Sequence, residues 1–311
     1  MDLRSKVAIV TGASRGVGAA TAVALAAEGV RVACAARATD EAPLRLPGTI
    51  DATARRITEA GGEAIAVPTN LAQDDDVEAL VDQTVDAFGG VDVLVNNAAI
   101  TFPGDLELEM KRFDLTLNVD LRAPLLAIRA VLPSMRARGG GRIVNVSSAA
   151  ALHYYPGLMA YGMAKIALEH LTVAAAEQLR HDAIAVNTFR IDVPVASEGF
   201  VANTPDQDHS AWEPSEVAAE GIVWMVRQPD SYSGHNDSKI DELYEKQRRT
   251  IDIVERTKIV REMERYALVQ AYNVPLLWWQ RIIVNHKKIQ GWYMTPSHYL
   301  WQDLSTVWLS E

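Results

Sequence analysis

A tyrosine and a lysine, Tyr161 and Lys165, lie four residues apart in a stretch with helical periodicity, Tyr161–Leu179. One helical turn separates them, so both side chains project from the same face. An ammonium at about 4 Å stabilises a negative charge by about 4 kcal/mol at an effective dielectric of 20, or about three pKa units. Such a shift brings the pKa of tyrosine from about 10 toward neutrality, where a general acid–base group works best. The pair therefore predicts proton transfer.

A glycine-rich turn, Thr11–Gly18, closes the first predicted strand and opens the first predicted helix. Gly12 permits a tight turn, Gly16 lets the backbone approach a pyrophosphate, and Gly18 lets the helix pack on the strand. The helix N-terminus adds free N–H donors and a partial positive charge. The turn therefore predicts a dinucleotide cradle.

Short apolar runs alternate with amphipathic helical stretches up to about residue 236. The predicted strands are Val7–Val10, Val30–Ala36, Glu63–Val67, Val91–Val95, Arg142–Val146 and Ala183–Phe189, and the clearest helices are Gly18–Glu28, Asp76–Phe88 and Tyr161–Leu179. Alternation of this kind is typical of βαβ units with right-handed crossovers. We therefore expect an α/β fold, a doubly wound, Rossmann-like parallel sheet.

Two more motifs follow predicted strands: Asn96–Ala99, and Asn145–Ser148 thirteen residues before Tyr161. Together with the glycine turn and the Tyr161–Lys165 pair, they resemble the short-chain dehydrogenase/reductase family, whose pattern is TGxxxGxG, NNAG, a serine and YxxxK. The resemblance covers residues 1 to about 235. It implies an NAD(P)-dependent oxidoreductase that moves a hydride between a nicotinamide and a carbonyl or secondary alcohol, with a small molecule as substrate.

The resemblance also implies roles for individual residues. Tyr161 is the acid–base group, Ser148 holds the substrate oxygen, Lys165 also binds the nicotinamide ribose, and Asn118 holds a water in the proton relay. The implied cofactor-binding residues are Gly12, Ser14, Arg15, Gly16, Val17, Gly18, Arg37, Asn70, Leu71, Asn97, Ala98, Tyr161 and Lys165. The sequence departs from the family at Ala99, which replaces a glycine, and at Ile191-Asp192, which replaces the Pro-Gly beside nicotinamide.

The end of the second predicted strand, Ala35-Ala36-Arg37, lacks the carboxylate that accepts the adenosine ribose hydroxyls of NAD. Arg37, together with Arg15 in the glycine turn, has the charge to pair with a 2′-phosphate. We therefore expect NADP as the cofactor, with NAD as the alternative.

The amino-acid composition limits which binding partners and which cellular location we expect. The 30 Lys and Arg residues against 40 Asp and Glu give a net charge of −10, which disfavours nucleic acid and anionic membranes. The lone Cys34 fits a reducing compartment, and we expect a cytoplasmic protein without a membrane span. The seven histidines show no metal-ligand spacing, so no metal site is predicted. The family resemblance implies a homo-oligomer, which the C-terminal tail is placed to obstruct.

The composition changes near residue 237. Five of the seven tryptophans and only one glycine lie beyond that point. The segments Asp241–Gln247, Arg256–Leu268, Val274–Leu276, Pro296–Leu300 and Gln302–Leu304 resemble the C-terminal end of family-5 solute-binding proteins of ABC transporters. We therefore expect two parts: residues 1–236, a dehydrogenase domain that lacks its last strand, and residues 237–311, an incomplete, unrelated α+β segment.

Two alternatives to an active oxidoreductase stay open. One is a fusion chimera with impaired catalysis, because the family's last parallel strand is replaced by Asp237–Lys239. The other is a solute-binding or transport protein, judged from the tail. Arg281–Val284 is a candidate substitute for the missing strand.

Overall fold

The computed structural model describes residues 2–228, the positions 239, 242–243, 246, 249–250 and 252–269, and two strand pairs of residues, 289–290 and 308–309. The chain divides into two compact units, Met1–Gly234 and His235–Glu311. Each unit is described by itself.

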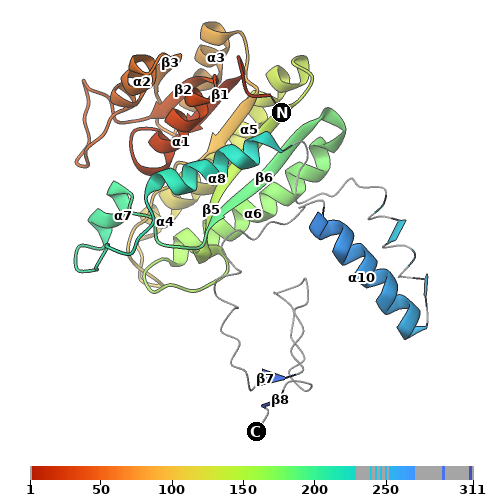
Figure 1. Cartoon of the computed structure of the whole chain (residues 1–311). Helices are drawn as coiled ribbons and strands as arrows, with labels where there is room; N and C mark the ends of the chain where they lie inside the picture. The colour runs from red at the N-terminus through yellow and green to blue at the C-terminus, as the bar shows by residue number, and fades with distance from the viewer. Residues whose placement is uncertain are drawn as a thin grey trace. The chain divides into compact units, whose positions relative to one another are not determined.

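The first unit is built on one parallel sheet of six strands in the order β3-β2-β1-β4-β5-β6 (Figure 1). The strands are β1 (Val7–Thr11), β2 (Arg31–Ala36), β3 (Ala64–Pro68), β4 (Val93–Asn96), β5 (Gly141–Ser148) and β6 (Ile184–Ile191). The chain first winds outward from β1 to β3 and then returns to add β4 to β6 on the other side of β1. The doubly wound, Rossmann-like sheet predicted from the sequence is confirmed.

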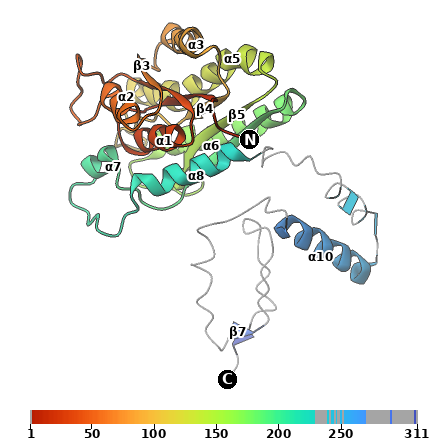
Figure 2. The same ribbon diagram turned by 45° about the horizontal axis from the view of Figure 1, so that its top comes forward.

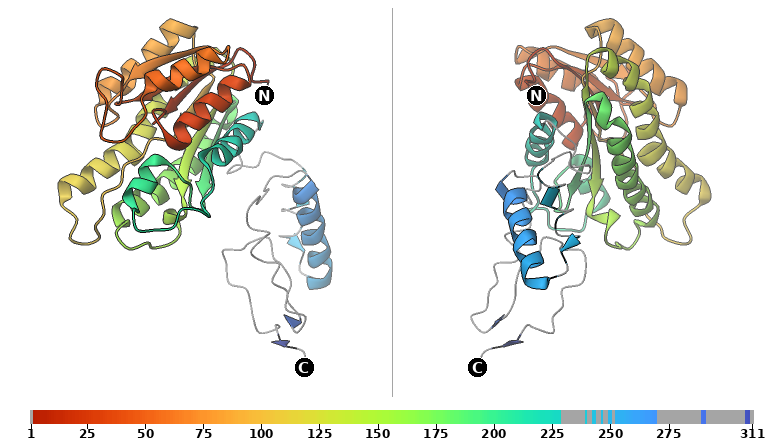
Figure 3. Two further views of the ribbon diagram at one scale, coloured as in Figure 1. Left: turned by 60° about the vertical axis from the view of Figure 1, so that its left-hand side comes forward. Right: turned by 90° about the vertical axis from the view of Figure 1, so that its right-hand side faces the viewer.

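Helices cover both faces of this sheet (Figures 2 and 3). One face carries α1 (Gly16–Ala27), α2 (Ile50–Glu59) and α8 (Ser215–Arg227), and the other carries α3 (Asp74–Phe88), α5 (Ala123–Ala137) and α6 (Met159–Leu179). The connections hold α4 (Met110–Leu117), the π-helix η1 (Asn118–Arg122), the 3₁₀ turns η2 (Ala149–Ala151) and η3 (Arg180–Asp182), and α7 (Glu198–Asn203). Among the described residues, no helix is both long and apolar enough to cross a lipid bilayer.

The core consists of two apolar clusters, one on each side of the sheet. Along β1, Ala8 and Val10 belong to the cluster under α1 and α8, whereas Ile9 belongs to the cluster under α3 and α5. Successive side chains of a strand point to opposite faces, so a strand buried on both sides must be apolar throughout. The continuous apolar strands of this sequence follow from that burial.

The sheet of residues 2–228 ends at β6, which pairs with β5 alone. The predicted loss of the family's last strand stays a prediction. The candidate substitute, Arg281–Val284, and the junction around residues 233–238 lie outside the described residues.

The second unit contains α10 (Ile253–Val269) and a short antiparallel pair, β7 (Ile289–Gln290) and β8 (Trp308–Leu309). Asp252 begins the helix, because its Oδ1 accepts the backbone N–H of Glu255 at 2.8 Å. The helix α10 covers the segment Arg256–Leu268 that was singled out in the sequence. The predicted extended pieces between residues 274 and 284 lie outside the described residues, so the resemblance of the tail to solute-binding proteins stays a prediction.

A buried carboxylate, Asp92, anchors the sheet at the edge opposite the carboxyl ends of the strands. Its side chain is 1 % exposed, and it accepts Val7 N–H at 2.9 Å and the Arg138 guanidinium at 2.7 and 3.0 Å. Lys6 approaches it at 3.3 Å. Burial by itself raises the pKa of Asp92, but the hydrogen bonds from Arg138 and Val7 outweigh burial and hold that pKa below its ordinary value.

We expect Asp92→Ala to lower the free energy of unfolding by about 3–5 kcal/mol at pH 7, because removing one partner strands buried polar groups. The lowered pKa means that this stabilisation is present above the pKa of the unfolded carboxyl, about 3.9, and is lost as pH falls through the folded value. Urea unfolding at several pH values measures it, and the gap to the wild type should narrow below about pH 4. Asp82→Ala, at an exposed position of α3, is the control. An equal effect of the two substitutions contradicts the prediction.

Candidate active site

The sequence motifs meet at the carboxyl edge of the central strands. The glycine-rich turn follows β1, Asn97 follows β4, and Ser148 ends β5, while β1, β4 and β5 are neighbours in the sheet. The strand order reverses beside β1, and ligands of open α/β sheets bind at the carboxyl edge of such a switch point. The helix α6 carries Tyr161 and Lys165 to this edge.

The glycine-rich turn has the backbone of a nucleotide cradle. Gly12 has φ +70° and Gly16 has φ +55°, values that side chains with a Cβ rarely adopt. A Cβ on Gly18 would lie 2.2 Å from the carbonyl oxygen of Gly12. The glycines of the turn and the start of α1 fit a pyrophosphate. Ser197 and the Glu198 carboxylate, at the start of α7, lie close to Gly16.

A threonine at the end of β1 holds the turn to β4. The Thr11 Oγ1 accepts the backbone N–H groups of Asn97 and Ala98, each at 3.1 Å. The side chain of Asn97 in turn donates to the Thr11 carbonyl at 2.9 Å. Asn97 and Ala98, which the resemblance placed against the cofactor ribose, therefore brace the glycine-rich turn in this structure.

Tyr161, Lys165 and Ser148 come together as predicted from their motifs. The Lys165 side chain is 2 % exposed, and its Nζ donates to the Val146 carbonyl of β5 at 2.9 Å. The same Nζ lies 5.4 Å from the centre of the Tyr161 ring, and Tyr161 is hydrogen-bonded to Ser148. The arrangement puts a phenol, an ammonium and a hydroxyl at one sheet edge.

The pKa of Tyr161 differs from the expectation. Its pKa lies above the ordinary value, because burial penalises the phenolate, the Asp120 carboxylate adds to this, and only the Ser148 hydrogen bond opposes both. The expected lowering by Lys165 is not what the structure shows. Burial also lowers the pKa of Lys165, while Asp120 raises it. The spacing of Tyr161 and Lys165 accounts for the ammonium, but it contains neither the burial of the phenol nor the neighbouring carboxylate, and both raise the pKa of Tyr161.

The segment that holds Asn118 buries a different polar residue. Asn118 is exposed, whereas Asp120, two residues further along, is fully buried and interacts electrostatically with both Lys165 and Tyr161. Buried Thr116 lies four residues before Asp120 and therefore shares its helix face. Two residues turn a helix by about 200°, so Asn118 points away from that face. The exposed position of Asn118 does not fit the relay role expected for it, and Asp120 is the buried polar residue of this segment.

The two arginines proposed to select NADP have different surroundings. The Arg15 guanidinium donates to three carbonyl groups of the loop at 46–48: Leu46 at 2.9 Å, Pro47 at 2.7 Å and Gly48 at 3.0 Å. Arg37 is exposed at the end of β2. Arg15 therefore holds this loop against the glycine-rich turn, and Arg37 is the better placed of the two for a phosphate.

The remaining predicted cofactor residues shape the same edge. Ser14 and Val17 are buried beneath the glycine-rich turn. The Asn70 Oδ1 accepts the backbone N–H of Ala72 at 3.2 Å, and its own N–H donates to Asp76 at 2.8 Å, so Asn70 and Leu71 lie in a locally hydrogen-bonded loop after β3. Their role in cofactor binding stays a prediction.

Next to Ser148, its neighbour Ser147 belongs to a hydrogen-bonded group that no motif indicates. Ser147 donates to Glu169 at 2.7 Å, and Glu169 is held in turn by the Arg190 guanidinium of β6, with the Nε at 2.7 Å. The link joins α6 to β5 and β6 next to the reacting groups. Neither Glu169 nor Arg190 belongs to a motif, so only their spatial meeting marks them.

A second contact that no motif indicates joins two loops, and its central residue is Asp105. Asp105 accepts the backbone N–H of Gly157 at 3.0 Å and the Tyr154 hydroxyl at 2.8 Å. It ties the loop after β4 to the loop that leads into α6. The loop that leads into α6 thus reaches the loop after β4 close to the start of the helix that carries Tyr161.

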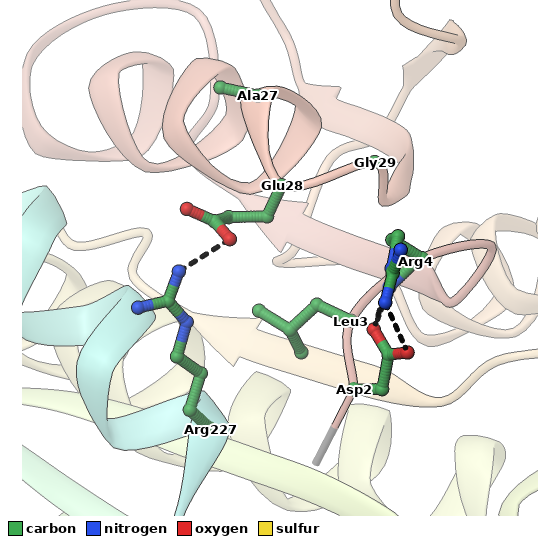
Figure 4. A pocket seen from close by; sticks show the side chains of 7 residues that line it. All are labelled: Asp2, Leu3, Arg4, Ala27, Glu28, Gly29 and Arg227. Atoms are coloured by element: carbon green, nitrogen blue, oxygen red, sulfur yellow. Dashed lines mark hydrogen bonds and ion pairs between the residues drawn. The ribbon is translucent and has the colours of Figure 1, made fainter.

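A surface pocket of about 500 Å³ lies at the other edge of the sheet, between the N-terminal residues and the ends of α1 and α8 (Figure 4). Its charged side chains pair among themselves, Arg227 with Glu28 and Arg4 with Asp2. Nothing in this pocket resembles a reaction centre. Among the described residues, no group of three or more His, Cys, Asp or Glu side chains is arranged to hold a metal ion.

Comparisons with known proteins point to one family. The family model for short chain dehydrogenase matches residues 6–194. The 3-oxoacyl-[acyl-carrier-protein] reductase of Synechocystis is 37% identical over 211 residues, which cover 67% of this chain and 79% of that protein. The hydroxysteroid dehydrogenase-like protein 2 of Danio rerio is 32% identical over 228 residues, and the chain spans only 54% of its length. A crystal structure of a metagenomic short-chain oxidoreductase in complex with NADP is 32% identical, with a TM-score of 0.62 over 73% of this chain and 93% of that one.

The tightness of the glycine-rich turn is testable with Gly18→Ala. The added Cβ would overlap the Gly12 carbonyl, so we expect a loss of about 1–3 kcal/mol in the free energy of unfolding and weaker dinucleotide binding. Urea unfolding and cofactor fluorescence titration measure the two effects. Gly199→Ala is the matched control, because its Cβ meets no atom within 4 Å. Unchanged stability and binding in the Gly18 variant would show that the turn has more room than the structure gives it.

Proposed function

Because the chain belongs to the short-chain dehydrogenase family, we propose that it transfers a hydride between NADP(H) and a carbonyl or secondary alcohol of a small molecule. The observation that carries the proposal is the meeting of Tyr161, Lys165 and Ser148 at the carboxyl edge of β5, beside the glycine-rich turn. A hydride donor or acceptor is the chemistry that a bound nicotinamide supplies. The side chains of this chain provide the proton and the orientation.

Each reacting group has a distinct task in this proposal. Ser148 donates a hydrogen bond to the substrate oxygen and holds it against Tyr161. Tyr161 gives its proton to that oxygen during reduction and takes it back during oxidation. The buried Lys165 ammonium stabilises the phenolate that results and binds the nicotinamide ribose. The raised pKa of Tyr161 favours the protonated form, which suits the acid needed for reduction.

NADP is the cofactor that the charges favour. The end of β2 carries exposed Arg37 in place of a carboxylate, and Arg15 holds the loop at 46–48 beside the cradle. A carboxylate at this point would repel a 2′-phosphate, whereas a guanidinium attracts it. NAD remains the alternative, and the comparison of NADPH with NADH decides between them.

The names of two relatives indicate which substrate classes to test. The relative in Synechocystis is named a 3-oxoacyl-[acyl-carrier-protein] reductase, and the relative in Danio rerio is named a hydroxysteroid dehydrogenase-like protein. We therefore propose a screen of NADPH oxidation over ketones, aldehydes and 3-oxoacyl thioesters. A homo-oligomer and a cytoplasmic location, both predicted above, belong to this proposal.

The competing proposal is a chimera with impaired catalysis. The observation that favours it is the end of the sheet of residues 2–228 at β6, which leaves that strand with one partner. The tail is predicted to resemble solute-binding proteins, and neither proposal assigns a reacting group to it. Unchanged NADPH fluorescence at high protein concentration favours the chimera, and saturable binding favours the enzyme.

Tyr161→Phe separates proton transfer from binding. We expect kcat/KM for carbonyl reduction to fall about 10²–10⁴-fold, because the acid group is lost, while the Kd for NADPH changes little. Steady-state rates and fluorescence titration measure these quantities. Tyr155→Phe, which removes a hydroxyl from a side chain that is 43% exposed, is the control. A Tyr161 variant as active as the wild type would remove the proposed acid.

Arg37→Glu tests the cofactor preference. We expect the Kd for NADPH to rise about 10-fold or more, since a hydrogen bond to a charged group contributes about 1.5–3 kcal/mol, whereas binding of NADH should not weaken. Fluorescence titration with both cofactors measures the ratio. Arg56→Glu, an equal charge change at an exposed site of α2, should leave that ratio as it is. Equal weakening for both cofactors would argue against recognition of a 2′-phosphate.

A further inference from the structure

A carboxyl group that no sequence motif indicated is buried in the reaction centre. Asp120 lies within the π-helix η1 and is 0% exposed. Its Oδ1 accepts the backbone N–H of Ile100, in the loop after β4, at 2.8 Å. Its Oδ2 is buried without a hydrogen-bond partner among the residues that the structure describes. A buried polar atom without a hydrogen-bond partner costs folding free energy, so its presence needs an explanation.

Three helices pack against η1: α4, α5 and α6. The charged side chains of α4 and α5 are exposed: Lys111, Arg112, Asp114, Arg129 and Arg136. On α6, which packs against η1, Lys165 and Tyr161 are the groups that interact electrostatically with Asp120. The loop after β4 contributes the Ile100 N–H. The charged side chain of η1 itself, Arg122, is exposed and paired with Asp74. The proton equilibria of Asp120, Lys165 and Tyr161 are therefore coupled to one another.

The charge on each of Asp120, Lys165 and Tyr161 changes the pKa of its neighbours. An ionised Asp120 favours the protonated Lys165 and disfavours the phenolate of Tyr161. Burial raises the pKa of Asp120 to about 7, and Lys165 acts in the opposite direction. The carboxyl is thus poised to change its charge within the pH range in which an enzyme works.

We propose that Asp120 is a positioning residue whose negative charge keeps the proton on Tyr161, so that the tyrosine serves as an acid for carbonyl reduction over a wide pH range. The proposal rests on the proposed function for its catalytic meaning. The burial of Asp120, its unpartnered Oδ2 and the packing of η1 against α6 do not depend on that function. The Asp120 carboxyl touches neither substrate nor cofactor in this account, and it acts through Lys165 and Tyr161.

A purely structural role is the alternative. In that case Asp120 only accepts the Ile100 N–H and fixes η1 to the loop after β4. An asparagine has the same shape and keeps an acceptor oxygen for Ile100, while it removes the charge. Asp120→Asn therefore distinguishes the two roles.

The first experiment is the pH profile of NADPH-dependent carbonyl reduction. The rate falls once Tyr161 loses its proton, and we expect Asp120→Asn to move this fall toward lower pH by about one unit or more. Below about pH 7, where the wild-type carboxyl is itself protonated, the difference should shrink. Asp114→Asn, at an exposed position of the preceding helix α4, is the matched control and should keep the wild-type profile.

The second experiment needs no turnover. Ultraviolet absorbance follows tyrosinate formation with pH, and subtraction of the matching Tyr161→Phe protein isolates Tyr161. We expect tyrosinate to form at lower pH in Asp120→Asn than in the wild type. Circular dichroism over the same pH range ensures that the folded proteins are compared.

The outcomes separate the two proposals. Coincident tyrosinate titrations in the wild type and Asp120→Asn overturn the role of the charge, whether or not a substrate has been found. A failed substrate screen with a shifted titration overturns the proposed function and leaves the coupling intact. If Asp120→Asn does not fold, a carbon NMR titration of the aspartate carboxyls in the wild-type chain decides. Ionisation of all the aspartate carboxyls before tyrosinate forms supports the proposal. One carboxyl that stays protonated up to that pH overturns it, because no charge would then act on Tyr161.

Discussion

The reaction centre depends on an ammonium group that is buried in the sheet edge. Burial of a charge is costly unless hydrogen bonds and opposite charges compensate it. Lys165 meets this requirement through the Val146 carbonyl of β5 and through the Asp120 carboxyl of η1. The lysine can keep its place beside Tyr161 only because α6, β5 and η1 are packed together. The fold and the proton chemistry are therefore parts of one arrangement.

The same strand that satisfies the ammonium also presents the hydroxyl. β5 contributes the Val146 carbonyl, then Ser147, which binds Glu169, and then Ser148, which meets Tyr161. Because the register of β5 against α6 fixes all of these contacts, a displacement of either element would disturb the acid, its neighbour and the substrate donor together. A set of side chains with such shared support is held in one geometry before any ligand arrives.

The nucleotide cradle is supported in a similar way by contacts distant in sequence. Thr11 fastens the glycine-rich turn to the end of β4, and Arg15 fastens the loop at 46–48 to the turn from the other side. In both contacts a side chain binds backbone groups of a distant segment, and together they fix the turn at the N-terminus of α1, where an anion is favoured. Arg15 and Arg37 look equivalent in the sequence. In the structure Arg15 holds the loop at 46–48, whereas Arg37 is exposed at the end of β2.

The sequence by itself determined the order of the six strands' segments, the glycine-rich turn and the Tyr161–Lys165–Ser148 set, because each rests on local spacing or on a motif. Tertiary structure alone decided what surrounds them. Asn118 is exposed whereas Asp120 is buried, since the face of a helix that becomes buried depends on what packs against it, here α6. The pKa of Tyr161 rises where the spacing predicted a fall, because burial and a carboxylate from another segment outweigh the ammonium one turn away. Electrostatic effects of this kind depend on three-dimensional distance and desolvation, and a linear spacing contains neither.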